Sequence, residues 1–170
     1  MISIGTERLV IRNFTRDDWV ALQQLIVAYQ ASDSAQYEDP WPTSDEKVQG
    51  IAGWFASGDD YLAVCLKESG TLLGLVAINR RDDQEAAIYN LGYVFHPGYA
   101  GQGYATESCR EAMGYLFDEL GIEGILTGTH PDNKPSIALL KRLGLREIGG
   151  GEWTLSKAEW IGLERAREGS

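Results

Sequence analysis

The sequence is poor in the residues on which metal sites and disulfide-rich folds depend. Its 170 residues include only two cysteines and two histidines. Cys65 and Cys109 lie in apolar surroundings, without a C-x-x-C pair or a Cys/His metal-ligand spacing. We therefore expect two buried free thiols, no metal and a reducing compartment.

Long apolar runs and an excess of basic residues are also missing. No stretch approaches the roughly 18 apolar residues of a membrane span. The first fourteen residues carry Glu7, Arg8 and Arg12 where a signal peptide needs its apolar segment. Lysine and arginine total 15 against 25 acidic residues, so the net charge is −10. This balance opposes binding to nucleic acid or anionic membranes. We expect a cytoplasmic protein, and the charge suits either a cationic partner or solubility alone.

What the chain does contain is ordinary globular composition. Apolar residues make up 44% and charged residues 24%, and five tryptophans with eight tyrosines argue against disorder. No repeat, low-complexity tract or break in composition is present. We expect a single domain over residues 1–170, with residues 165–170 as a loose tail.

The pattern of apolar residues and turn signals predicts a mixed α+β fold with about seven strands. Strands are predicted over residues 3–13, 61–66, 71–79, 87–95, 125–129, 145–148 and 153–160. Helices are predicted over residues 15–29, 43–57, 104–120 and 133–143. The strands at 61–66 and 71–79 are almost continuously apolar, which indicates helices on both faces of the sheet. Trp19, Trp54 and Phe55 lie on helical stripes and are expected in the core.

The glycine-rich turn after the fourth predicted strand is the most informative segment. A helix that begins after such a turn exposes backbone N–H groups to an anion. Gly98 and Gly103 have the spacing of an NTP-binding loop, but Tyr104-Ala105 replaces the required Lys-Ser/Thr. Thr106 stands where a dinucleotide fingerprint needs a small residue. Neither nucleotide is favoured, and a tight turn without a ligand remains the alternative.

Three segments resemble motifs of the GNAT N-acetyltransferases, in their RimJ/RimL-like branch. Tyr99 to Glu107, Y-A-G-Q-G-Y-A-T-E, resembles the acetyl-CoA motif. Residues 6–12, T-E-R-L-V-I-R, resemble the first strand of that branch. Asn133-Lys134-Pro135-Ser136, followed by Leu143-Gly144-Leu145, resembles its N-x-x-S helix and exit. The resemblance implies a GNAT fold whose sheet is splayed between its fourth and fifth strands, with acetyl-CoA as cosubstrate.

The resemblance also implies which residues contact acetyl-CoA. Backbone N–H groups of the glycine turn would bind the pyrophosphate, and the end of the fourth strand would bond the pantetheine amides. Asn133 would contact the pantetheine arm, or else serve only as a helix N-cap. For Glu107 we prefer the interpretation that a first-turn glutamate complements the helix dipole. The cofactor-binding residues implied are Val94, Phe95, Gly101, Gln102, Gly103, Tyr104, Ala105, Thr106 and Asn133. Lys134, Lys141 and Arg142 are candidates for the 3′-phosphate.

The catalytic residues are less completely matched. By resemblance, Ser136 would donate a hydrogen bond to the leaving sulfur, and its alternative is a solvent-facing serine. Ala100 replaces a larger side chain of the family. Asn90 stands where many relatives carry glutamate, so the obvious general base is absent. An amide cannot take a proton, although it can orient a water.

Other residues must then supply the base and recognise the amine. The base candidates are His96, whose intrinsic pKa is suitable, and the carboxylates Glu85, Glu38 and Asp39. Glu38 and Asp39 lie between two aromatic residues and could recognise an amine, or could form a solvated loop. The catalytic candidates are thus Ser136, Asn90 and His96, and the substrate candidates are Glu38 and Asp39.

The weak base bears on the choice of substrate. Acetyl transfer needs a neutral amine, and at pH 7 about 0.04% of a lysine amine is neutral against about 17% of an α-amine. We expect an acetyl-CoA-dependent N-acetyltransferase that acts on a peptide or protein N-terminus by direct attack on the thioester, as a monomer or homodimer. One alternative is a small cationic amine, such as a polyamine or aminoglycoside. The other is a non-catalytic CoA-binding sensor, which the departures at Asn90 and Ala100 motivate.

Overall fold

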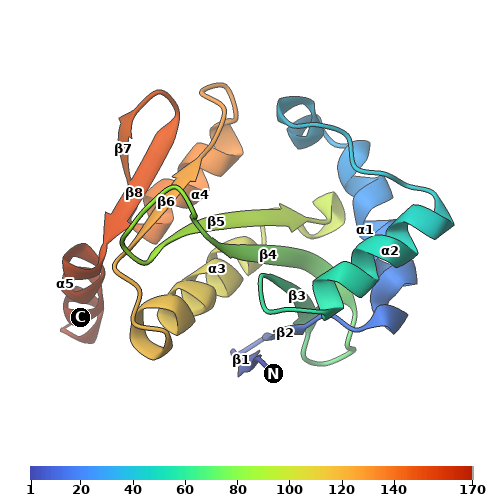
Figure 1. Cartoon of the computed structure of the whole chain (residues 1–170), viewed down its shortest axis with the longest axis horizontal. Coiled ribbons are helices and arrows are strands. Elements are labelled where there is room, and N and C mark those ends of the chain that lie inside the picture. Colours follow the sequence, from blue (N-terminus) through green and yellow to red (C-terminus); the bar gives the residue numbers. More distant parts are fainter. Residues whose placement is uncertain (170) are drawn as a thin grey trace.

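The structure, a computed structural model that describes residues 1–169, is built on one mixed sheet of eight strands (Figure 1). The strands are β1 (Ser3–Gly5), β2 (Leu9–Asn13), β3 (Tyr61–Leu66), β4 (Leu72–Arg80), β5 (Ile88–Phe95), β6 (Gly124–Gly128), β7 (Arg146–Gly149) and β8 (Glu152–Ser156). Their order across the sheet is β1-β2-β3-β4-β5-β6-β8-β7. The predicted α+β class is confirmed. The strand count exceeds the predicted seven because residues 3–13 turn at Thr6 and form two antiparallel strands.

The helices lie on the two faces of this sheet, as predicted. They are α1 (Trp19–Gln30), α2 (Asp45–Ala56), α3 (Tyr104–Gly114), α4 (Lys134–Leu143) and α5 (Lys157–Glu168). Figure 1 shows α1 and α2 together at one end of the molecule, with α3 and α4 near β5 and β6. Residues 115–119 continue α3 as a π-helical turn.

Two hydrophobic clusters fill the two faces, and β5 contributes to both. Val94 packs in the cluster that contains residues of α1 and α2, whereas Leu91 packs in the cluster that contains residues of α3 and α4. Phe55 is buried as expected, but Trp54 is 60% exposed and was wrongly assigned to the core. Phe55 takes the inward position on α2. The Trp54 ring lies beside the rings of Phe55 and Tyr61, and its centroid is 5.0 Å from the Tyr61 centroid. The two cysteines are buried and free, as expected.

The C-terminal segment differs from the prediction. The strand predicted over residues 153–160 ends at Ser156, and residues 165–168, predicted as a loose tail, belong to α5; Ser170 lies outside the described residues. Ser156 and Glu159 form a capping box that starts this helix. Trp160 is buried, and its ring stacks on Phe117 at 5.2 Å between centroids. The ring stack holds α5 against the π-helical turn that continues α3.

The sheet opens between β5 and β6. These strands are parallel and pair only through Ile88 with Gly124 and Tyr89 with Ile125. Beyond these two pairs the strands separate. β6 remains paired with β8 on its other side, and β5 remains paired with β4. The splay expected between the fourth and fifth predicted strands is therefore confirmed. Within residues 1–169 no helix is both long and apolar enough to cross a membrane.

Candidate active site

A cavity of about 790 Å³ lies where β5 and β6 diverge. Its walls come from both strands, from the glycine turn and the start of α3, from the start of α4, and from the segment after α1. A second cavity of about 620 Å³ adjoins it and shares Gly101, Gly103, Thr106 and Arg142. Segments far apart in the sequence thus surround one connected space. Among residues 1–169, no group of three or more His, Cys, Asp or Glu side chains is arranged to hold a metal.

The glycine turn has the geometry of an anion site. Gly101 and Gly103 have φ of +78° and +84°, in the left-handed region that favours glycine. Gly103 is the residue before α3, and no side chain caps that helix. The first intrahelical bond reaches back from the Glu107 N–H to the Gly103 carbonyl. The N–H groups of residues 104–106 therefore have no intrahelical acceptor and can bind an anion.

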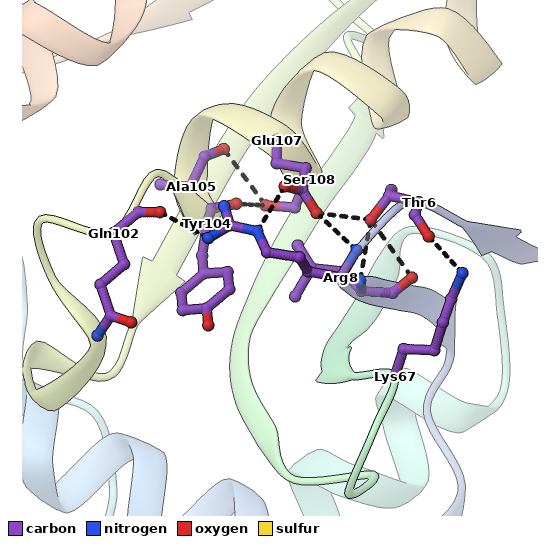
Figure 2. A network of polar contacts seen from close by, with 9 residues as sticks. Thr6, Arg8, Lys67, Gln102, Tyr104, Ala105, Glu107 and Ser108 are labelled. Carbon is purple, nitrogen blue, oxygen red and sulfur yellow. Dashed lines mark hydrogen bonds and ion pairs between the residues drawn. The ribbon is translucent and has the colours of Figure 1, made fainter.

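Arg8 fastens this turn to the start of β2 (Figure 2). Its Nε donates to Glu107 Oε1 at 2.9 Å, its Nη1 donates to the Gln102 carbonyl at 2.9 Å, and its guanidinium lies 4.2 Å from the Tyr104 ring centroid. Thr6 Oγ1 donates to Glu107 Oε2 at 2.6 Å. Burial opposes ionisation of Glu107, but these hydrogen bonds and the Arg8 charge hold its pKa below the ordinary value. Glu107 thus joins two elements, a role that our helix-dipole interpretation missed.

The end of β5 turns alternate backbone groups toward the gap. The His96 N–H donates to the Leu73 carbonyl at 2.8 Å, which fixes the even-numbered residues of β5 toward β4. Tyr93 and Phe95 therefore direct their backbone N–H and C=O groups to the opposite side, where β6 has diverged. Val94 was predicted beside Phe95 as a cofactor contact. The strand alternation turns its backbone to β4, and its side chain packs beneath α1 and α2.

The start of α4 brings Ser136 to the cavity. Asn133 caps this helix, because its Oδ1 accepts the Ser136 N–H at 3.4 Å. The hydroxyls of Ser136 and Tyr93 lie 2.5 Å apart. Burial raises the pKa of Tyr93 above its ordinary value, so its hydroxyl stays protonated at neutral pH. Tyr93 was not among the predicted site residues.

Asn90 and Glu38 are two further polar residues that line the cavity. Thr127 Oγ1 lies 2.9 Å from both Asn90 Oδ1 and the Leu91 carbonyl, and its single hydrogen is shared between these two acceptors. Glu38 Oε1 accepts a hydrogen bond from Trp41 Nε1 at 3.2 Å. Burial, and then the Glu38 charge, raise the pKa of Tyr29. Within residues 1–169, Glu38 is the one acidic side chain that lines this cavity.

Both histidines line the cavity, and both are engaged through Nδ1. His96 Nδ1 accepts the Gly98 N–H at 2.9 Å, and His130 Nδ1 accepts the Asp132 N–H at 3.1 Å. Nδ1 of each ring is thus occupied as an acceptor, and Nε2 is the ring nitrogen left for another partner. The His130 ring also stacks on Tyr37, with 4.9 Å between centroids.

The structure brings most of the predicted site residues to this cavity. Those that line it are Asn90, Phe95, His96, Gly101, Gly103, Tyr104, Ala105, Thr106, Asn133, Ser136 and Glu38. Among the described residues, Val94, Gln102, Asp39 and Glu85 are not in the lining. Gln102 instead offers its carbonyl to Arg8. Tyr29, Tyr93, Thr127 and His130 also line the cavity and were not predicted. The alternation of side chains along residues 91–95 was the signal available for Tyr93.

Known proteins resemble this chain over most of its length. A family model described as an acetyltransferase (GNAT) domain matches residues 8–146. The N-acetyltransferase YnaD of Bacillus subtilis strain 168, itself uncharacterized, is 28% identical over 160 residues, which cover 88% of this chain and 91% of that protein.

Solved structures resemble it in fold. A GNAT-family acetyltransferase from Bacillus anthracis has a TM-score of 0.83 at 24% identity, covering 93% of this chain and all of that one. A Vibrio cholerae protein, provisionally described as a ribosomal-protein-serine acetyltransferase, has a TM-score of 0.74 at 26% identity, covering 91% and 97%.

Proposed function

The chain belongs to the GNAT acetyltransferase family, and we propose that it transfers an acetyl group from acetyl-CoA to the α-amine of a peptide or protein N-terminus. The observation that carries this choice of substrate is that, within residues 1–169, the cavity is lined by an amide, Asn90, and by a single carboxylate, Glu38. Such a site has little basic power. It suits an amine that is already partly neutral at pH 7.

The residues present fit acetyl-CoA, whose thioester supplies the activated acetyl group. The left-handed glycines and the uncapped first turn of α3 offer backbone N–H groups to the pyrophosphate. Tyr93 and Phe95 offer the backbone of β5 to the pantetheine amides. Arg142 lines both cavities, and its Nε donates to Thr106 Oγ1 at 3.2 Å. Its guanidinium would supply positive charge for the phosphates of acetyl-CoA.

The reaction is a direct transfer without a covalent enzyme intermediate. The neutral amine nitrogen forms a bond to the thioester carbonyl carbon, and the bond from that carbon to sulfur breaks as sulfur takes the electron pair. The amine loses its proton to a water held by Asn90. A backbone N–H of β5 that faces the gap stabilises the charge on the carbonyl oxygen. Ser136 donates a hydrogen bond to the departing sulfur.

The distribution of charge in the cavity favours an α-amine over a polyamine. Recognition of a polyamine calls for several carboxylates along the pocket, whereas Glu38 is the single one among the described lining residues. Glu38 lies exposed on the segment after α1, where it attracts the ammonium form of the substrate. The provisional description of the Vibrio cholerae relative, which names a ribosomal protein as substrate, supports the same choice.

Thiol release from acetyl-CoA tests the proposal. The panel pairs each peptide with the same peptide acetylated at its N-terminus, and adds polyamines, aminoglycosides and free amino acids. We expect turnover only where a free peptide α-amine is present. Turnover on the blocked peptides through lysine, or on the polyamines alone, would contradict the substrate. Tight CoA binding with no turnover on any amine would support the sensor instead.

A further inference from the structure

A short side-chain hydrogen bond inside the cavity joins two hydroxyl groups. Tyr93 on β5 and Ser136 on α4 are 43 residues apart, and their oxygens lie 2.5 Å from each other. Each hydroxyl has one hydrogen, so one of them donates to the other and the acceptor keeps its own hydrogen for another partner. The direction of this bond decides which hydroxyl serves the substrate.

The chemistry of the two groups favours donation by Tyr93. A phenol, with an ordinary pKa near 10, is a stronger acid than an alkyl hydroxyl and therefore the better donor. Ser136 is also held in place, because its backbone N–H is bonded to Asn133 in the first turn of α4. Tyr93 packs its ring against the cluster beneath α3 and α4. Within residues 1–169, the hydrogen-bond partner of the Tyr93 hydroxyl is Ser136.

We propose that Tyr93 is a positioning residue, which donates its hydrogen bond to Ser136 and thereby leaves the serine hydrogen directed at the sulfur of the substrate. This inference rests on the proposed function, because it assigns Ser136 to the leaving group. When the carbon–sulfur bond breaks, sulfur carries the electron pair as a thiolate. Ser136 stabilises that charge through a hydrogen bond, and Tyr93 strengthens the bond by polarising the serine hydroxyl.

Neither hydroxyl gives up its proton in this step. A thiol, with an ordinary pKa of about 8.5, is a stronger acid than either hydroxyl, so the thiolate is protonated by solvent after it leaves. Two other ionisable groups act on Tyr93. Burial raises the pKa of the Cys109 thiol and keeps it neutral, and the positive charge of Arg142 opposes the rise in the pKa of Tyr93.

The ionisation of CoA bound to the protein tests this directly. The ultraviolet absorption of the thiolate is followed as pH is raised, and the complex with desulfo-CoA is subtracted to remove the tyrosines. Ser136→Ala should raise the pKa of the bound thiol by about one unit, which corresponds to tenfold weaker stabilisation of the thiolate. Tyr93→Phe should raise it by less. Tyr93→Phe should have no further effect in the Ser136→Ala background.

Control variants separate this role from a loss of structure. Tyr61→Phe removes a tyrosine hydroxyl from the cluster on the opposite face and should leave the thiol pKa unchanged. Ser136→Thr keeps a hydroxyl, so Tyr93→Phe in the Ser136→Thr background should again raise the pKa of the bound thiol. A wild-type thiol pKa in Tyr93→Phe would overturn the proposal. So would fully additive shifts in the double variant, because Tyr93 would then act independently of Ser136.

The kinetic readout is a split between kcat and KM. With an accepted peptide, Ser136→Ala should lower kcat by about ten- to a hundredfold, and Tyr93→Phe by about three- to tenfold, with the KM for acetyl-CoA changed by less than about twofold. The thiol titration needs no amine, so it gives a result even if no amine in the panel is acetylated. Failure of the proposed function and failure of this inference are therefore distinguishable.

Discussion

Arg8 Nε and Glu107 Oε1 lie 2.9 Å apart and tie the first strands of the sheet to the first turn of α3 (Figure 2). The same guanidinium reaches the carbonyl of Gln102 and covers the Tyr104 ring. One side chain thus contacts the glycine turn at Gln102 and the first turn of α3 at Tyr104 and Glu107. The turn has little rigidity of its own, because two of its residues are glycines in the left-handed region.

Arg8→Ala should therefore weaken binding of acetyl-CoA without altering the chemistry. Because the ion pair is partly exposed, we expect the KM for acetyl-CoA to rise by about three- to tenfold, with kcat nearly unchanged. Steady-state kinetics with varied acetyl-CoA measure this. Arg146→Ala, which breaks the ion pair with Glu159 on the far edge of the sheet, is the matched control. An equal loss in both variants would show that the Arg8 effect is not local.

Glu38→Gln should weaken binding of the amine substrate. The exposed carboxylate attracts a cationic amine in solvent, so we expect the KM for the amine to rise by about two- to fivefold at low salt and the KM for acetyl-CoA to stay constant. The difference from wild type should shrink as ionic strength increases. Asp33→Asn removes a neighbouring exposed charge outside the cavity lining and should change neither constant. A salt-independent effect of Glu38→Gln would contradict a charge-based role.

Stability should depend on pH through Asp18. Burial opposes its ionisation, but hydrogen bonds from Arg12 and Thr15 hold its pKa below the ordinary value. A carboxylate whose pKa is lowered by folding stabilises the fold fully above its unfolded pKa, near 3.9, and loses that contribution as pH falls through the folded value. Asp18→Asn should thus be less stable than wild type at pH 7.

Urea unfolding at several pH values checks this expectation. The gap in unfolding free energy between wild type and Asp18→Asn should narrow below about pH 4, since both chains then carry a neutral side chain there. Asp17→Asn removes the preceding carboxylate and should leave the pH profile intact. A gap that stays constant down to low pH would show that Asp18 acts through shape and not through its charge.

Trp160→Ala should destabilise the whole fold. The side chain is 3% exposed, its ring stacks on Phe117, and its Nε1 donates to Asp118 at 3.0 Å. Removal of such a tryptophan costs about 3–5 kcal/mol in unfolding free energy. Ile161→Ala, the next residue, is 40% exposed and should cost far less. Denaturant unfolding compares the two, and similar losses would mean that α5 contributes little through its buried face.

Several features of the site could be predicted because their causes are local. The positive φ of Gly101 and Gly103 follows from a turn that only glycine tolerates well, and the N-cap role of Asn133 follows from its position before a proline-containing first turn. The start of α5 also has a local cause, although the sequence there was ambiguous. The capping box at Ser156 was readable, but the apolar spacing of Trp153 to Trp160 suggested a strand instead.

Other features depended on which residues face the gap. Phe95 and Val94 are neighbours, yet strand parity turns one to the cavity and the other to the opposite core. Glu38 lines the cavity, whereas Asp39 beside it does not. Alternation along a strand separates the two members of the first pair, but the sequence does not say which of them faces the cavity. The register of β5 on β4 decides which alternate residues of β5 face the cavity, and that register depends on residues of another strand.

The sequence by itself determined the family motifs, the glycine turn before α3 and the absence of a strong base at position 90, because each depends on residue type and near neighbours. Only the tertiary structure decided that Tyr93 meets Ser136 and that Arg8 holds Glu107. Those contacts join elements 43 and 99 residues apart. They exist because helices pack on both faces of a sheet that opens between β5 and β6, and packing over such distances follows from the whole core.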